Sequence, residues 1–323
     1  MSDYNRYTTG EQVASDCRSS IENKTVLITG VTSGGLGAGF ATIIAPYRPS
    51  VIILAARDTS KAEETAQQIQ SIAPSVVTRI LELDLNSQTQ IRKAAKEVLS
   101  YEEHIDVLVN NAGVMGPPFR LTEDGLESQF GINHIGHFLF TNLIMNKLVA
   151  PGKSARVVNV ASDGYRMGPI RFEDWNFDDG NTYDPWLGYA QAKTANMLFS
   201  VSLARKLGKV GLVSVSLHPG VINTNLLRYD VGASVDAIVK WDKLQGNRSY
   251  WDGFKWKTMS QGVATHVVAA FHHMISPTEN NGSFLSDSTV IIPEDIRCWA
   301  RDEIEAEKLW KLSEKIVGER FHY

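Results

Sequence analysis

The stretch Lys24-Thr-Val-Leu-Ile-Thr29 runs directly into Gly30-Val-Thr-Ser-Gly-Gly-Leu-Gly37. The first part is apolar and β-branched, as in a strand buried on both faces, and the second part reads as a glycine-rich turn that opens a helix. Glycines let a backbone approach a pyrophosphate closely, and a helix N-terminus offers free N–H groups to the phosphates. A Walker A loop is excluded because no Lys-Ser/Thr pair follows the last glycine. The stretch therefore predicts a nucleotide-binding turn.

The same alternation of strand and helix continues along the chain. Buried strands are expected at residues 24–29, 50–56, 76–83, 105–109, 156–160 and 212–217. Helices are expected at residues 36–45, 59–72, 88–100, within 125–148, at 187–207 and at about 301–317. Apolar strands that alternate with helices form a parallel sheet covered on both faces. The predicted fold class is α/β: a Rossmann fold with a doubly wound parallel sheet, plus a small helical substrate-binding lobe.

The length of 323 residues exceeds the roughly 250 residues that single α/β domains commonly reach. The surplus is expected in an N-terminal extension at 1–23, an insert at 163–188, the lobe at about 225–260 and the C-terminal helix at about 301–317. Residues 24–323 are then a single nucleotide-binding domain. None of the extra segments is expected to form a second domain.

Composition excludes several other classes of protein. The net charge of −4 gives no basic surplus for a nucleic-acid binder. Cys17 and Cys298 match no metal or disulfide spacing, and His134 and His137 are expected to be packed histidines, so no metal site is predicted. No signal sequence and no apolar run of about 18 residues is found, which predicts a cytoplasmic protein without a membrane span.

The end of the second strand, Ala55-Ala56-Arg57-Asp58, bears on the choice of nucleotide. NAD-binding proteins usually place a carboxylate there for the ribose 2′-hydroxyl, whereas an arginine accommodates a 2′-phosphate. Ala56 offers no carboxylate, so Arg57 favours NADP(H) over NAD(H). The alternative is that Arg57 is a surface charge and Asp58 caps the next helix.

The sequence Tyr189-Ala-Gln-Ala-Lys193 places a phenol and an ammonium on one face of a helix. A neighbouring ammonium stabilises the phenolate and lowers the tyrosine pKa, which makes Tyr189 a candidate acid or base. Ser162 follows the strand at 156–160, at the sheet edge where ligands bind, and its hydroxyl could polarise a substrate carbonyl. The alternative for Ser162 is a turn cap.

Together these motifs resemble the short-chain dehydrogenase/reductase family over roughly residues 24–290, and within it the retinol-dehydrogenase-like and WW-domain-oxidoreductase-like branch. The family motifs are matched by Asp84-Leu85, by Asn110-Asn111-Ala112-Gly113, by Asn133, by Ser162, Tyr189 and Lys193, and by Pro219 to Thr224. The insert around Gly168 to Phe177, with Lys257 to Gly262 and Asn281 to Asp287, resembles the branch. The glycine turn departs from the family by one extra residue, which leaves its phosphate contacts open.

The resemblance implies a catalytic set of Asn133, Ser162, Tyr189 and Lys193. Tyr189 would be the general acid or base, Lys193 would lower its pKa and hold the nicotinamide ribose, and Ser162 would polarise the carbonyl. Asn133 would hold a water that relays protons to Lys193. The residues expected to bind the cofactor are Gly30, Thr32, Ser33, Gly34, Gly35, Leu36, Gly37, Arg57, Asp84, Leu85, Asn110, Ala112, Gly113, Tyr189, Lys193, Pro219, Gly220, Val221 and Thr224.

The predicted function is an NADPH-dependent reductase that interconverts a carbonyl and an alcohol on a lipophilic small molecule, with a secondary metabolite as one option. Aromatic residues of the lobe are expected to wall the substrate pocket, flanked by Trp175 and Trp186, or else only to stabilise the lobe. They are Tyr229, Trp241, Tyr250, Trp251, Phe254 and Trp256. An NADP-assisted isomerase or cyclase and a cofactor-sensing regulatory protein remain alternatives. A homo-oligomer is also left open.

Overall fold

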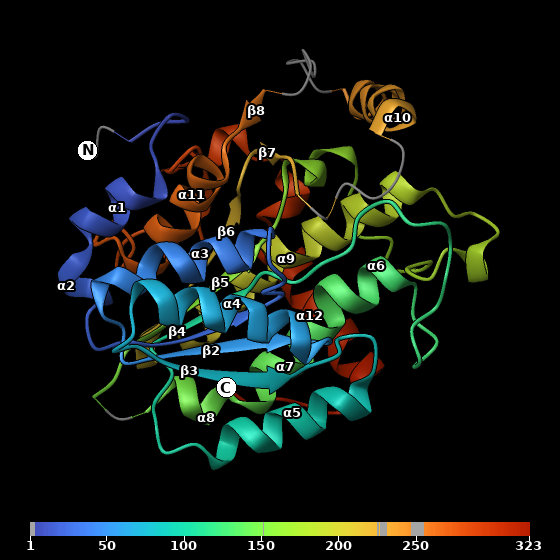
Figure 1. The fold of residues 1–323 in the computed structure, drawn as a ribbon. Coiled ribbons are helices and arrows are strands. Elements are labelled where there is room, and N and C mark those ends of the chain that lie inside the picture. Colours follow the sequence, from blue (N-terminus) through green and yellow to red (C-terminus); the bar gives the residue numbers. More distant parts are fainter. Residues whose placement is uncertain (1–3, 151, 225, 227–230, 247–254) are drawn as a thin grey trace.

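The computed structural model describes residues 4–150, 152–224, 226, 231–246 and 255–323. An eight-stranded sheet lies at its centre, in the order β10-β9-β6-β5-β4-β1-β2-β3 (Figure 1). The strands are β1 (Thr25–Thr29), β2 (Val51–Ala56), β3 (Val77–Glu82), β4 (Val107–Asn110), β5 (Ala155–Val160), β6 (Leu212–His218), β9 (Phe284–Ser286) and β10 (Thr289–Val290). Neighbouring strands are parallel except β10, which is antiparallel to β9.

The strand order reverses at β1, which pairs with β2 on one side and with β4 on the other. The chain therefore leaves β1 and β4 toward opposite sides of the sheet. In open α/β sheets this reversal opens a crevice at the carboxyl ends of the strands, where ligands bind. The glycine-rich turn and the Asn110–Gly113 turn follow β1 and β4 directly, so both lie at this crevice.

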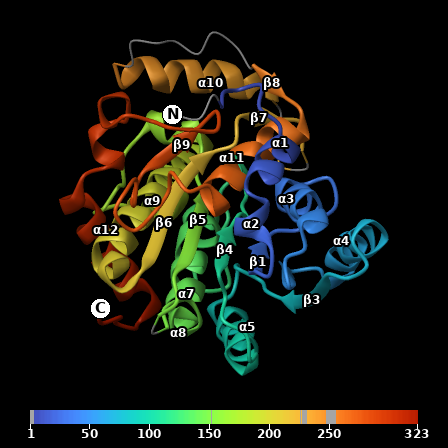
Figure 2. The ribbon, with the colours of Figure 1, turned by 90° about the vertical axis from the view of Figure 1, so that its left-hand side faces the viewer.

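Helices cover both faces of the sheet. The helices are α1 (Gly10–Asp16), α2 (Arg18–Ile21), α3 (Leu36–Ile44), α4 (Thr59–Ile72), α5 (Gln88–Ser100), α6 (Ser128–Phe130), α7 (Gly136–Leu143), α8 (Met145–Leu148), α9 (Pro185–Leu207), α10 (Val231–Leu244), α11 (Met259–Phe271) and α12 (Glu303–Val317). One face is packed by α1, α3, α4 and α11, and the other by α5, α7, α9 and α12. Figure 2 shows α1 beside α11 and α12 beside α9.

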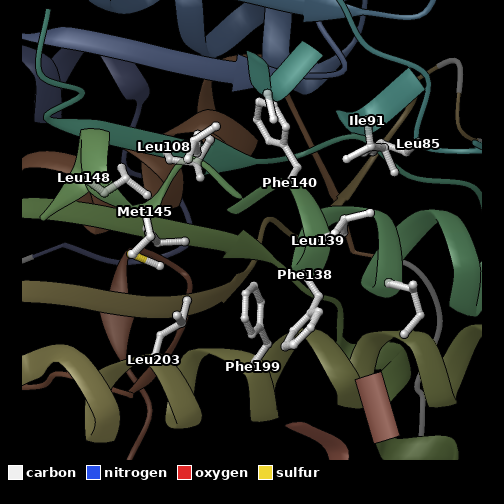
Figure 3. Packing of buried hydrophobic residues seen from close by; sticks show 14 of the residues in the cluster. Leu85, Ile91, Leu108, Phe138, Leu139, Phe140, Met145, Leu148, Phe199 and Leu203 are labelled. Atoms are coloured by element: carbon white, nitrogen blue, oxygen red, sulfur yellow. The ribbon is translucent and has the colours of Figure 1, made fainter. Parts of the chain in front are cut away.

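The two faces explain why the strands are apolar throughout. In β1, Leu27 joins the core on the α7 and α9 side, whereas Val26 and Ile28 join the core on the α3 and α11 side. In the first of these cores, Phe138 of α7 and Phe199 of α9 pack with their ring centroids 5.4 Å apart (Figure 3). The predicted doubly wound Rossmann fold is confirmed.

The structure departs from the sequence prediction in several segments. The helix expected within 125–148 is divided into α6, a π-helical turn at Gly131–Ile135, α7 and α8. The strands β9 and β10 and the helix α11 were not predicted; the two strands have only three and two residues, too few for a clear pattern. The extension before residue 24 forms α1 and α2, and α1 packs on α11 through buried Val13 and Ala14.

The lobe between β6 and α11 holds α10 and a small second sheet. In that sheet, β7 (Val221–Ile222) pairs in parallel with β8 (Trp256–Lys257). In Figure 1 and Figure 2, α10 lies at the same end of the molecule as β7 and β8. The expected C-terminal helix is present as α12. Within the described residues, no helix combines the length and the apolar character needed to cross a membrane.

Candidate active site

The glycine-rich turn leaves no room for side chains at two positions. Gly30 has a φ of +74°, and a Cβ there would lie 2.7 Å from the Ala112 Cα. A Cβ at Gly37 would lie 2.6 Å from the Gly30 carbonyl oxygen. Both positions therefore require glycine, because the turn after β1 closes tightly against the turn after β4.

The N-terminus of α3 fits a phosphate group. The helix begins after Gly35, which adopts an extended conformation and supplies no side-chain hydrogen bond to the first turn. The Gly35 N–H donates to the Thr32 carbonyl, and Ser33 accepts a hydrogen bond from Gln68 on α4, so both sides of the turn are fixed. A helix end without a side-chain cap leaves N–H groups and a positive dipole for an anion. This arrangement, which includes Gly34 and Leu36, fits the predicted pyrophosphate of the cofactor.

Arg57 lies beside this turn, at the end of β2. The Gly30 N–H donates to the Ala55 carbonyl (2.8 Å), which joins the start of the turn to the same strand end. Arg57 is exposed and forms no ion pair with the described residues. Asp58 caps α4 by accepting a hydrogen bond from the Ser60 N–H, so it is engaged in its own helix. The positive charge of Arg57 is thus available to a ligand.

The expected adenine-side residues lie after β3 and β4. Asp84 accepts a hydrogen bond from the Asn86 N–H, and Leu85 is buried against Gly136. The side chain of Asn110 points into the protein, where its Nδ2 donates to Thr141 and Asn159. We therefore expect Asn110 to reach a cofactor only through its main chain.

Asn111 is a site residue that was not among those predicted. Its Nδ2 donates to the main-chain oxygens of Thr29 (2.9 Å) and Gly30 (3.0 Å), which ties the β4 turn to the glycine-rich turn. The signal was present in the sequence, since Asn111 belongs to the same motif as Asn110, Ala112 and Gly113. Only the contacts in the structure show that Asn111, and not Asn110, joins the two turns.

Ser162, Tyr189 and Lys193 lie next to one another in the structure. Ser162 follows β5, accepts a hydrogen bond from the Gly164 N–H, and shares a side-chain hydrogen bond with Tyr189. It is therefore both a turn cap and a neighbour of the phenol. The Lys193 Nζ lies 5.6 Å from the centroid of the Tyr189 ring and donates to the Val160 carbonyl (2.9 Å). The side chains of a serine, a tyrosine and a lysine thus lie close together at the carboxyl edge of the sheet.

Burial controls the ionisation of this group. It raises the pKa of Tyr189 to about 12, with the Ser162 hydrogen bond acting in the opposite direction. It also lowers the pKa of Lys193 to about 7. The expected lowering of the Tyr189 pKa is therefore not seen in this structure, because desolvation of the phenolate dominates. At neutral pH Tyr189 carries its proton, the form that a general acid needs.

Asn133 lies in the π-helical turn between α6 and α7 and clamps the neighbouring main chain. Its Oδ1 accepts from the Val114 N–H (2.8 Å) and its Nδ2 donates to the Val114 carbonyl (2.9 Å). Its own main-chain oxygen accepts from Asn196 Nδ2 (2.8 Å) and lies 3.0 Å from His137 Nδ1. Protein donors therefore occupy this carbonyl, and the water-holding role of Asn133 stays a prediction.

The Pro219–Thr224 segment follows β6 at the same edge of the sheet. Gly220 has a φ of +95°, and a Cβ there would lie 2.6 Å from the Lys257 side chain. Val221 pairs with Trp256 in the small sheet, and Thr224 accepts a hydrogen bond from the Leu226 N–H. The segment that was predicted to contact the cofactor is thus joined to the base of the lobe.

Apolar side chains surround Tyr189 on the lobe side. Buried Met167, Ala190 and Ile238 pack with Tyr189, and half-buried Met115, Trp186 and Trp241 pack around them. Trp186 and Trp241 therefore lie close to Tyr189, and their role in a substrate pocket stays a prediction. Trp175 does not lie there, because it packs against Phe130 in the large core. Trp256 is half exposed on β8, and Tyr229, Tyr250, Trp251 and Phe254 lie outside the described residues.

His134 and His137 are buried and hydrogen-bonded to protein groups. Across the part of the chain that the structure describes, no group of three or more His, Cys, Asp or Glu side chains is placed to hold a metal ion.

Comparison with known proteins agrees with this geometry. A family model described as short chain dehydrogenase matches residues 24–174. The chain is 36% identical over 317 residues to short-chain dehydrogenase TIC 32 B, chloroplastic, of Brassica napus, covering 94% of this chain and 92% of the relative. It is 34% identical over 305 residues to retinol dehydrogenase 11 of Homo sapiens, covering 94% and 89%.

A solved structure of an uncharacterized protein from Mycobacterium paratuberculosis matches with a TM-score of 0.71 and 31% identity, covering 94% of this chain and 96% of that chain. The fold, the arrangement of the site and the similar proteins thus agree on one family. The chain belongs to the short-chain dehydrogenase family of nicotinamide-dependent oxidoreductases, in its retinol-dehydrogenase-like branch.

Proposed function

We propose that the protein is an NADPH-dependent oxidoreductase that interconverts a carbonyl and an alcohol on a lipophilic small molecule. The observation that carries this proposal is the shared position of Ser162, Tyr189 and Lys193 beside the crevice of the sheet. The tight glycine turn and the uncapped α3 N-terminus support the binding of a dinucleotide next to them.

The bound nicotinamide would supply or accept the hydride. The chain itself supplies the proton and the orientation of the reacting groups. In reduction, the Tyr189 hydroxyl gives its proton to the substrate oxygen as negative charge develops there, and in oxidation the phenolate takes it back. The Ser162 hydroxyl donates a hydrogen bond to the same oxygen.

Lys193 would act on Tyr189 through its charge. Burial lowers the pKa of Lys193 to about 7, so part of the protein carries this charge at neutral pH. In that form Nζ favours the phenolate that remains once the proton has left, which lowers the cost of the transfer. Its hydrogen bond to the Val160 carbonyl fixes the ammonium at the end of β5, close to Ser162. Asn133 holds the Val114 segment, which follows Gly113 at the cofactor side.

Two features support the finer assignments. Arg57, with Ala56 before it, favours the 2′-phosphate of NADP(H). The surroundings of Tyr189 are apolar, with Met115, Ile238 and two tryptophans, which suits a lipophilic ketone or alcohol. A cytoplasmic location and self-association stay predictions from the sequence.

The test is NADPH oxidation by the purified chain with a panel of lipophilic and polar ketones. We expect the native protein to reduce the lipophilic ketones. We expect Ser162→Ala to lose this activity. Ser202→Ala, a buried α9 serine that bonds to Ala306, is the matched control and should retain activity. NADPH oxidation that is equal in native protein and Ser162→Ala would contradict the proposal.

A further inference from the structure

His137 uses both ring nitrogens inside the protein. It lies on α7 at 1% exposure, with Nδ1 3.0 Å from the Asn133 main-chain oxygen and Nε2 2.9 Å from the Thr29 hydroxyl. A carbonyl oxygen can only accept, so Nδ1 must carry the proton. In a neutral imidazole Nε2 is then the acceptor, and the Thr29 hydroxyl donates to it. The geometry thus selects one tautomer.

The Thr29 end of this link lies beneath the cofactor turn. Thr29 is the last residue of β1, directly before Gly30. Its hydroxyl oxygen accepts from the N–H groups of Asn111 and Ala112, both at 3.0 Å. The Val109 carbonyl also lies within reach of the Thr29 hydroxyl, but at 3.5 Å it is farther than His137 Nε2 at 2.9 Å, so the proton goes to His137. The hydroxyl then fixes the turns after β1 and β4 to each other.

The Asn133 end of the link lies beneath the catalytic residues. The same Asn133 oxygen accepts from Asn196 of α9, the helix that carries Tyr189 and Lys193. The Asn133 Oδ1 and the Lys193 Nζ both border the place where a Gly113 Cβ would stand, at 3.1 and 3.8 Å from it. A continuous chain of hydrogen bonds therefore runs from β1 through His137 and Asn133 to α9.

We propose that His137 is a positioning residue, which ties the Asn133 carbonyl and the catalytic helix α9 to the end of β1 beneath the cofactor turn. It acts through Thr29 and Asn133 and touches no reacting atom. Burial lowers the pKa of His137 to about 4, and the charge of Lys193 acts in the same direction. The ring therefore stays neutral at neutral pH, and both of its hydrogen bonds persist.

Two substitutions separate the two ends of the link. An asparagine amide takes the place of Nδ1, and Asn142 of the same helix already donates to the carbonyl four residues before it, that of Phe138 (2.8 Å). His137→Asn should therefore keep the bond to Asn133 and lose the bond to Thr29. A glutamine amide reaches the place of Nε2. His137→Gln should therefore keep the hydrogen bond to Thr29 and lose the hydrogen bond to Asn133.

The two variants should split cofactor binding from catalysis. For His137→Asn we expect the dissociation constant for NADPH to rise about tenfold, with kcat within about threefold of the native value. For His137→Gln we expect kcat to fall about tenfold or more, with NADPH binding within about threefold. A residue that only filled space would show no such reciprocal pattern.

His266 on α11 provides a matched control pair. It is also fully buried, and its Nδ1 lies 3.2 Å from the carbonyl oxygen of Gly262, again four residues earlier. Its Nε2 has no hydrogen-bond partner among the described residues. His266→Asn and His266→Gln should therefore leave both kcat and NADPH binding near the native values. Equal effects of the His137 pair and the His266 pair would overturn the inference.

A measurement on the unmodified protein does not depend on how the variants fold. Nitrogen-15 NMR of histidine-labelled protein should show His137 as the Nδ1–H tautomer at neutral pH, and an Nε2–H tautomer would overturn the inference. The kinetic arm rests on the proposed function, because kcat is read from NADPH oxidation. If no ketone is turned over, the proposed function fails, while the tautomer and the NADPH binding constants still decide the role of His137.

Discussion

Trp241 of α10 donates its indole N–H to the carboxylate of Asp184 at a distance of 3.2 Å. Asp184 is the N-cap of α9, where its other oxygen accepts from the N–H groups of Trp186 and Leu187. A single carboxylate thus fixes the start of the catalytic helix and docks the lobe onto it. A second link joins α10 to the segment after Ser162, where Arg166 pairs with the nearly buried Asp242 (3.5 Å).

Loss of the Trp241 hydrogen bond should loosen the lobe over Tyr189. Trp241→Phe keeps an aromatic ring and removes the hydrogen-bond donor. We expect KM for a lipophilic ketone to rise about threefold to tenfold, because that is the effect expected when one partly exposed hydrogen bond is lost. Because the cofactor turn is untouched, KM for NADPH should not change. Steady-state kinetics with each substrate varied in turn measures this split.

Trp310→Phe is the control for that experiment. Trp310 of α12 likewise donates to a carboxylate, that of Glu314, but it packs against Phe199 of α9 in the large core and is not among the residues around Tyr189. It should leave both KM values unchanged. A rise in the ketone KM in the control as large as that in Trp241→Phe would contradict the docking role of Trp241.

Replacement of Arg57 should change the preference between the two nicotinamide dinucleotides. Arg57→Ala should raise KM for NADPH by about tenfold to a hundredfold, because a charge-assisted hydrogen bond to a 2′-phosphate is lost. KM for NADH, which lacks that phosphate, should stay within about twofold. Arg57→Lys keeps the charge and should retain part of the preference; if Arg57→Ala weakens both cofactors equally, Arg57 does not read the 2′-phosphate.

Acid should destabilise the fold through its buried histidines. Burial lowers the pKa of His134 to about 3 and the pKa values of His137 and His266 to about 4, against 6.5 in the unfolded chain. As the pH falls below 6.5, the unfolded chain binds these three protons and the native protein does not, which alone costs stability with a limiting slope of about 4 kcal/mol per pH unit. Burial also lowers the pKa values of His218 and His272, which adds to the loss in the same direction. Buried Glu127, whose pKa is raised, opposes this by at most one proton.

Urea unfolding between about pH 7 and about pH 5 measures the effect. The free energy of unfolding should fall toward pH 5. In His266→Gln the slope should be shallower by about the contribution of one proton. A free energy of unfolding that stays constant over this range would show that the histidines are not held neutral.

The parts of the site that depend on local pattern could be predicted from the sequence. The β1 run, the glycine turn and the Tyr189–Lys193 pair can each be recognised in a short stretch of residues. The structure forms β1 as a central strand and places the glycine turn directly after it. The lengths of β1 and α9 were predicted to within a few residues. These features are local consequences of strand and helix geometry.

The rest depends on contacts between distant segments. The π-helical turn at 131–135 could not be predicted, because Asn133 is held there by Val114 and Asn196, which lie far away in the sequence. The pKa of Tyr189 was predicted in the wrong direction, because spacing gives the position of Lys193 but not the depth of burial. His137 was correctly expected to be packed, but its two partners come from β1 and the π-helical turn.

In the proposed mechanism, Tyr189 supplies the proton that accompanies hydride transfer from NADPH. Tyr189→Phe removes the hydroxyl while keeping the ring among Met167 and Ile238. We expect kcat for ketone reduction to fall by about a hundredfold to ten-thousandfold, while the dissociation constant for NADPH stays within about threefold. Ketone reduction by Tyr189→Phe at the native rate, with NADPH still bound, would contradict the proposed mechanism.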